Sequence, residues 1–212
     1  MNKEDVKKAL EELKKQPKRK FLQSYDLIVN LKNIIIKQNP LDFFVTLHHS
    51  RGRKVKVAAF VDQQLKEQAK KFCDLVIEEK DFAAYADKKK AKKLAQEYDY
   101  FIAQSTLMPK VAAAFGKVLG VRGKMPNPKL GNVVLPNANL DILKQKLEKT
   151  IRLSAKVGTN LQCVVGKETQ LEEEVIDNIL IIYQTALKNL PSEAQNIKNV
   201  QIKLTMGKPV KV

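Results

Sequence analysis

The stretch Val200-Gln-Ile-Lys-Leu-Thr-Met-Gly-Lys208 carries the pattern on which the fold prediction rests. Its apolar side chains occupy every second position, at Val200, Ile202, Leu204 and Met206. Period two is typical of a β-strand with one face in a core and the other in solvent. Gly207 ends the pattern, and Lys208-Pro209 leave no room for another element. The stretch predicts a sheet strand, with Thr205-Met206-Gly207 either an ordinary strand end or a binding edge.

The composition favours a polyanionic partner. The chain has 212 residues and carries 39 Lys+Arg against 23 Asp+Glu, a formal net charge of +16. A small acidic ligand does not require so much positive charge, whereas a nucleic acid or an anionic membrane surface does. No apolar run is long enough to span a bilayer, and Met1–Asp5 opens no signal peptide. We therefore expect a cytoplasmic protein with no membrane partner.

Motifs for catalysis or metal binding are absent from the sequence. His48 and His49 are adjacent, so in a strand they point to opposite faces and cannot chelate one metal. Cys73 and Cys163 lie far apart without CxxC partners, which favours two buried thiols over a disulfide or a metal site. The turn Val61–Gln64 offers no glycine to a phosphate. We expect no enzyme, no cofactor and no metal.

The first fifty residues predict one helix and two strands. Asn2 can cap a helix that ends before Pro17, with an apolar stripe at Val6, Ala9, Leu10 and Leu13. From Ser24 the apolar residues alternate, at Tyr25, Leu27, Val29 and Leu31, and Leu41–Leu47 predicts a second strand. These elements are too few to form a core of their own.

Strand and helix patterns alternate through the middle of the chain. The predicted strands are Val55–Val61, Leu75–Ile77 and Tyr100–Ala103. The predicted helices begin at Asp62, at Asp81 (running to Tyr98), at Ser105 and at Asn139. This alternation is typical of a Rossmann-like, three-layer α/β domain with a parallel sheet.

The pattern reverts to antiparallel after residue 150. Ile151–Val157 and Leu161–Val165 alternate on either side of a turn at 158–160, which predicts a hairpin. Thr169 and Glu172 form a capping box for an amphipathic helix that Pro191 stops. The stripe of this helix is Val175, Ile176, Ile179, Leu180, Tyr183 and Leu187.

The fold class that follows is a two-domain α/β and α+β protein. An outer α+β domain, residues 1–52 and 150–212, builds an antiparallel sheet from both chain ends, and residues 53–149 form the inserted α/β domain. The chain would cross between the domains twice, which predicts a double hinge at Arg51, Gly52, Lys149 and Thr150.

A basic loop joins two helices of the insert. Residues 120–131 contain two prolines and three glycines, which argue against regular structure, and the cations Arg122, Lys124 and Lys129 are expected at its surface. Gly120-Val-Arg-Gly123 has the spacing of a GxxG backbone clamp, but no helix pattern follows it directly. The lysine run from Lys88 to Lys93 is interpreted as a solvated helix face.

Three stretches together resemble one protein family. They are Lys20-Phe-Leu-Gln-Ser24, Gly120-Val-Arg-Gly-Lys-Met-Pro-Asn-Pro-Lys129 and Leu204-Thr-Met-Gly-Lys-Pro209. In this order they resemble the ribosomal protein L-one family of the large-subunit stalk, over essentially the whole chain. Val121 departs from the family's usual Gly-Pro-Arg-Gly. The chain length and the ending Lys208-Pro-Val-Lys211 resemble the archaeal type.

The resemblance implies that the outer domain binds large-subunit rRNA through a sheet edge and its turns. The implied contact positions are Lys20, Phe21, Ser24, Lys156, Gly158, Lys203, Thr205, Met206, Gly207 and Lys208. Lys156 and Gly158 match less cleanly and are expected near the others. The resemblance also implies that the insert swings at the hinge to assist release of exit-site tRNA, and that the free protein, a monomer, represses its own mRNA.

The chemistry of these residues suits RNA. Gly207 would let the backbone meet RNA closely, hydroxyls can bond 2′-hydroxyls, and Phe21 and Met206 can pack on sugars or bases. Each residue also has a structural alternative, since Phe21 and Met206 could be core residues and Ser24 and Thr205 ordinary strand residues. The alternative functions are a nucleic-acid enzyme with a small-molecule site in the insert, or a ribosome-biogenesis protein.

Overall fold

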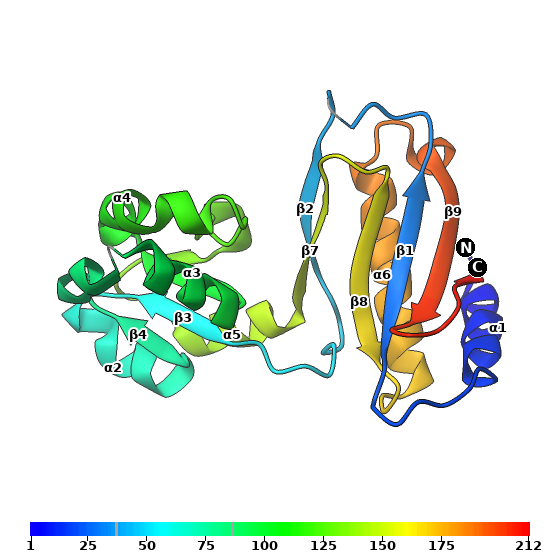
Figure 1. Ribbon diagram of the computed structural model, residues 1–212, viewed down its shortest axis with the longest axis horizontal. Coiled ribbons are helices and arrows are strands. Elements are labelled where there is room, and N and C mark those ends of the chain that lie inside the picture. Colours follow the sequence, from blue (N-terminus) through cyan, green and yellow to red (C-terminus); the bar gives the residue numbers. More distant parts are fainter. Residues whose placement is uncertain (37, 86) are drawn as a thin grey trace. The chain divides into compact units, whose positions relative to one another are not determined.

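A computed structural model describes residues 1–36, 38–85 and 87–212 of the chain (Figure 1). It divides into two compact units: a terminal unit, Met1–Arg53 with Lys149–Val212, and an inserted unit, Lys54–Glu148. Each crossing lies one residue from the predicted boundary at 52/53 or 149/150. That each unit folds as a domain of its own stays a prediction.

The terminal unit is built on a four-stranded antiparallel sheet of order β10-β9-β1-β8. Its strands are β1 (Ser24–Leu31), β8 (Asn160–Lys167), β9 (Ile197–Leu204) and β10 (Val210–Lys211). β1 pairs with β8 on one side and with β9 on the other, so Ile28 lies opposite both Gln162 and Gln201. The prediction of an antiparallel sheet from both chain ends is confirmed, but the chain after Lys208 does hold another strand, β10.

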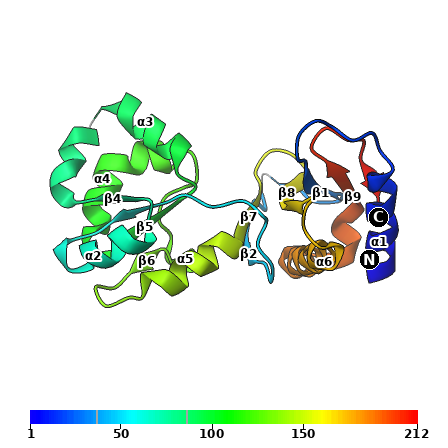
Figure 2. The same ribbon diagram turned by 90° about the horizontal axis from the view of Figure 1, so that it is seen from below.

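Two helices complete the core of the terminal unit. α1 (Lys3–Lys14) buries the predicted stripe, and Figure 2 shows α6 (Glu172–Asn189) along one face of the sheet. The predicted capping box at Thr169 is wrong, because the residue before the helix is Leu171 and three glutamates occupy the first turn. The buried face of α6 continues through Ile182 and Ala186, while Leu180, Tyr183 and Leu187 are only half-buried.

The predicted hairpin is also wrong. β7 (Thr150–Ala155) pairs with β2 (Leu41–Thr46) in a separate two-stranded sheet, whereas β8 pairs with β1. Val45 of β2 lies opposite Ile151 of β7. Alternation specifies which face of a strand is buried, but it does not choose the partner strand.

The inserted unit is a parallel sheet between two helical layers, as predicted. The strands β3 (Val57–Phe60), β4 (Leu75–Ile77), β5 (Tyr100–Gln104) and β6 (Val133–Val134) have the order β4-β3-β5-β6. Figure 2 shows α3 (Lys88–Glu97) and α4 (Met108–Leu119) on one face, with α2 (Gln63–Phe72) and α5 (Leu140–Lys149) on the other. The sequence did not predict β6, which is too short to show a period.

Two segments of the insert differ from the prediction. The helix expected over 81–98 is a 3₁₀ helix, Glu79–Tyr85, followed by α3, and residue 86 between them lies outside the described residues. The carboxylate of Asp87 accepts the Lys89 N–H (2.9 Å) and starts α3 afresh. The loop at 120–131 contains a 3₁₀ turn, Pro128–Leu130, and the Asn127 side chain accepts the Lys129 N–H (3.0 Å).

Each unit has its own hydrophobic core. The terminal core is mainly aliphatic and joins α1, α6 and both sheets. The inserted core centres on aromatic rings, with the Phe60 and Phe115 centroids 4.8 Å apart. No helix among the described residues is long and apolar enough to cross a membrane.

Because each unit has its own core, we expect the terminal and the inserted unit to unfold independently. Ile202 and Phe115 are each fully buried, in the terminal and the inserted core respectively. Ile202→Ala should lower the free energy of unfolding of the terminal unit by about 2–5 kcal/mol, and Phe115→Ala that of the inserted unit by about 3–5 kcal/mol. Hydrogen exchange on the full chain would show each loss confined to its own unit; equal acceleration in both units would contradict separate folding.

Candidate nucleic-acid interface

Residues from both chain ends meet where β1 begins and β9 ends. The Ser24 N–H donates to Thr205 Oγ1 (3.1 Å), and the Thr205 N–H donates to the Ser24 carbonyl (3.1 Å). The Met206 N–H donates to Oε1 of Gln23 (3.1 Å). The structure therefore brings together Ser24, Thr205 and Met206, which are about 180 residues apart in sequence.

A buried amide and a carboxylate hold this junction. Gln23 is only 2 % exposed. Its N–H donates to Glu168 Oε2 (3.0 Å), and its carbonyl accepts the Glu168 N–H (3.1 Å). Sequence reasoning missed both residues. The one signal in the sequence was the polar Gln23 inside the Lys20–Ser24 motif, next to apolar residues. In the structure these apolar residues are exposed and Gln23 is buried.

Gly207 has a different role from the one expected. A Cβ at this position would lie 2.6 Å from Gln16 Oε1 and 3.0 Å from the Leu204 Cβ. Gln16, just beyond α1, accepts the Lys208 N–H through Oε1 and donates through Nε2 to the Lys208 carbonyl, both at 3.0 Å. Packing within the protein therefore favours glycine here, because a Cβ would displace the Gln16 amide and crowd the Leu204 side chain.

The side chains around the junction form an exposed apolar and hydroxyl surface. Phe21 is 52 % exposed and Met206 is 61 % exposed, so the interpretation of either as a core residue is wrong. Met206 leaves the buried face because β9 ends at Leu204. We define the strand-end surface as Lys20, Phe21, Ser24, Lys203, Thr205, Met206 and Lys208. Its lysines are exposed except Lys203, which is half-buried.

Lys156 and Gly158 lie elsewhere, and the expectation that they adjoin the other contact residues is wrong. The Leu31 N–H donates to the Thr159 carbonyl (2.7 Å), and Asn30 lies opposite Asn160. This turn is therefore at the other end of β1 from Ser24, about 20 Å away at the rise of an extended strand. Both residues are exposed.

Comparison with known proteins gives the family. Residues 13–208 match the Ribosomal protein L1p/L10e family. The chain belongs to this family. It is 38 % identical over 213 residues to the large ribosomal subunit protein uL1 of Nanoarchaeum equitans, covering 99 % of this chain and 98 % of that protein. It is 37 % identical over 216 residues to uL1 of Methanothermococcus thermolithotrophicus, covering 100 % and 99 % respectively.

These similarities confirm the resemblance to the ribosomal protein L-one family, of archaeal type. A ribosomal-protein family is not a family of enzymes, and the chain is accordingly not an enzyme. Within the described ranges no group of three metal-ligating side chains could hold a metal ion. Both cysteines are free, and burial raises the pKa of Cys163 to about 12, so its thiol is not poised for chemistry.

The residues predicted as a hinge differ in how firmly they are held. Lys149 Nζ donates to the His48 carbonyl (2.9 Å), and the Lys149 carbonyl accepts the Leu47 N–H (2.9 Å). Thr150 is buried in the two-stranded sheet. Gly52 has a φ of 71°, a left-handed conformation that favours glycine, and Arg51 precedes it.

The neighbouring histidines contact α6. His48 Nδ1 lies 2.8 Å from Asp177 Oδ2, and the His49 N–H donates to Asn178 Oδ1 (3.2 Å). Both histidines are therefore attached to the helix, although the His48 side chain remains exposed.

Only part of the basic loop at residues 120–131 is an exposed cationic surface. Lys124 Nζ donates to the carbonyls of Ala95 (2.9 Å) and Tyr98 (2.6 Å) at the end of α3. A cation at a helix C-terminus satisfies carbonyls that lack partners within the helix. Lys124 thus has a structural role, contrary to the expectation, while Arg122 and Lys129 are exposed.

The packing around Gly207 predicts a selective loss of stability. Gly207→Ala would displace the Gln16 amide and break its two bonds to Lys208, which should lower the free energy of unfolding of the terminal unit by about 1–3 kcal/mol. Gly158→Ala is the matched control, because its Cβ would meet only the end of Asn160, 2.9 Å away, whereas a Cβ at Gly207 would also lie 3.0 Å from the Leu204 Cβ. The control should change stability by less than about 0.5 kcal/mol in urea unfolding; equal losses would contradict this role of Gln16.

Proposed function

We propose that the chain is a structural constituent of the large ribosomal subunit and binds large-subunit rRNA through the strand-end surface. The observation that carries this is the convergence of exposed Phe21 and Met206 with the Thr205 hydroxyl and lysines at one junction. RNA is recognised through 2′-hydroxyls, unstacked bases and phosphates, which hydroxyls, apolar faces and cations complement respectively. The names of the archaeal relatives support the same assignment and a place on the ribosome.

The strand-end surface is preorganised for this contact. Five hydrogen bonds, two between Gln16 and Lys208 and three between Ser24 and Thr205, hold residues 205–208 before any ligand arrives. A surface that is already ordered loses little conformational entropy on binding. The terminal unit is thus suited to rigid, lasting attachment.

We further propose that the inserted unit moves relative to the attached terminal unit and assists release of tRNA from the exit site. The two chain crossings and the left-handed Gly52 support a pivot near Arg51–Gly52, since Lys149 and Thr150 are bonded into the β2–β7 sheet. Arg122 and Lys129 would supply cationic contacts on the inserted unit.

Repression of the chain's own mRNA follows if that mRNA carries an rRNA-like fold. The free monomer would occupy the message only when rRNA sites are filled. A tenfold preference for rRNA needs only about 1.4 kcal/mol.

The enzyme alternative gains no support from the inserted sheet. The turn after β3 is where a mononucleotide fold binds phosphate. Here the Asp62 carboxylate accepts the Gln63 N–H (2.7 Å) at the start of α2. A carboxylate on the helix N-terminus repels the anion that the position would have to hold.

Two substitutions test the strand-end surface directly. Thr205→Ala should lower affinity for archaeal large subunits stripped of their own uL1 about 3- to 10-fold, because it removes the hydroxyl that would contact RNA and that also bonds to Ser24. Thr205→Ser keeps the hydroxyl and should restore binding. Met206→Asp, which adds a carboxylate beside phosphates, should cost at least about 10-fold.

Val157→Asp is the matched control for Met206→Asp, because Val157 is 88 % exposed in the turn at the far end of β1. Co-sedimentation with the stripped subunits measures all four variants. Unchanged binding by both Thr205→Ala and Met206→Asp would refute the proposed surface, and an equal loss with Val157→Asp would mean that charge alone matters.

Salt dependence gives an independent prediction. If about six phosphates are contacted, affinity should fall roughly 10³-fold between 50 and 200 mM monovalent salt, because bound cations are released from the RNA. Filter binding of the full chain to stripped large-subunit rRNA would show this slope. A flat profile would contradict recognition through phosphates.

A further inference from the structure

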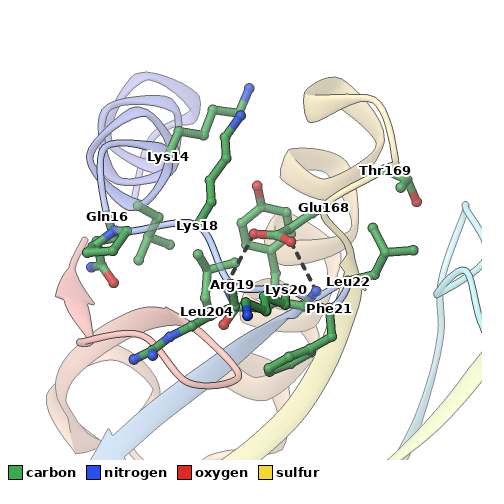
Figure 3. A pocket seen from close by; sticks show the side chains of 14 residues that line it. Lys14, Gln16, Lys18, Arg19, Lys20, Phe21, Leu22, Glu168, Thr169 and Leu204 are labelled. Carbon is green, nitrogen blue, oxygen red and sulfur yellow. Dashed lines mark hydrogen bonds between the residues drawn. The ribbon is translucent and has the colours of Figure 1, made fainter.

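A cavity of about 680 Å³ opens beside the strand-end surface, within the terminal unit (Figure 3). Its volume falls in the range of about 300–1,000 Å³ that is typical of small-molecule sites. Leu13, Tyr25 and Leu204 contribute an apolar floor, and each is at most 5 % exposed. Phe21 also lines the cavity, with about half of its surface in solvent.

A carboxylate lies among these apolar walls. In the view of Figure 3, Glu168 stands between Lys18 and Leu22, and the dashed lines from its carboxylate mark its hydrogen bonds, which are to Gln23. Its Oε2 accepts the Gln23 N–H (3.0 Å), and its Oε1 lies 3.5 Å from Gln23 Nε2. A carboxylate offers about four acceptor sites, so both oxygens can accept further hydrogen bonds. Burial, and then the charge of Glu168, raise the pKa of Tyr25, which keeps its phenol a donor.

Cations surround the mouth of the cavity. Lys18, Arg19 and Lys20 all line it and are exposed, and no hydrogen bond or ion pair joins them to another described residue. Lys14 is not equivalent, because its ammonium is paired with Glu172. A carboxylate repels phosphate, so the phosphate of a ligand would bind at these cations and its hydrogen-bond donors at Glu168.

We propose that this cavity holds one unstacked guanine nucleotide of the bound RNA. The Watson–Crick edge of guanine presents two parallel donors, N1–H and N2–H, which match the two oxygens of Glu168, while the base lies on the apolar floor. Charge-assisted bonds to a carboxylate are among the strongest available, and unstacked bases are commonly recognised on this edge. The inference rests on RNA binding by the strand-end surface and names the nucleotide read beside it.

The test is an amide-shift titration of the full-length ¹⁵N-labelled chain. The probes are GMP, AMP, CMP, UMP and inorganic phosphate at constant ionic strength. We expect GMP to shift amides of residues 13–25, 168–169 and 204 and to bind roughly fivefold or more tightly than the other nucleotides, equivalent to about 1 kcal/mol. No shifts at these residues, or phosphate reproducing the GMP shifts at equal affinity, would overturn the proposal.

Two variants separate the carboxylate's role from general charge. Glu168→Gln can still accept the Gln23 N–H, so it should fold, but the preference for GMP should disappear. Glu173→Gln removes a neighbouring exposed carboxylate that does not line the cavity, and it should leave the preference intact. A preserved GMP preference in Glu168→Gln, or its loss in Glu173→Gln, would refute the assignment.

A trinucleotide distinguishes RNA from a free nucleotide as the occupant. ApGpA should bind more tightly than GMP and than ApUpA, because flanking phosphates reach Lys18, Arg19 and Lys20. If GMP binds more tightly than ApGpA, the occupant is a free nucleotide and the proposal fails. If the chain binds stripped subunits but GMP causes no amide shifts, only the guanine site in the cavity is refuted. If GMP binds as expected but Thr205→Ala and Met206→Asp bind subunits like the wild type, only the strand-end surface is refuted.

Discussion

The two-sided pairing of β1 is the constraint on which the terminal unit depends. One strand from the first part of the chain bonds to β8 and β9, both from the last part. This pairing joins the chain ends into one core and puts Ser24 beside Thr205. The whole intervening unit, Lys54–Glu148, can therefore be inserted without breaking the core that surrounds β1.

Buried polar groups turn this junction into a defined surface. Gln23 is buried among apolar residues, yet its amide and main chain bond to Met206 and Glu168. An unsatisfied buried amide would be costly, so these bonds keep the three segments in one arrangement. Gln16 does the same for Lys208. The exposed hydroxyl, thioether and aromatic groups are thus positioned by buried and half-buried polar residues beneath them.

The inserted unit shows a different organisation, with a parallel sheet and an aromatic core. Charged side chains of this unit bond to the ends of its helices, as Asp62, Asp87 and Lys124 do. A residue that appears to be a free charge in the sequence is in these cases a partner of a helix end. Charge counts alone therefore overstate the cationic surface of this unit.

The sequence by itself determined most of the elements and the fold class. Periodicity gave the faces of α1 and β1, and the alternation of strands and helices gave the parallel sheet, because burial of apolar side chains follows local geometry. The motifs at Lys20–Ser24 and Leu204–Pro209 indicated the family. Only the tertiary structure decided which strands pair, so the hairpin at 151–165 and the placement of Lys156 were wrong. It also decided the roles of Gln23, Glu168 and Gly207, because these depend on contacts between residues that lie far apart in the chain.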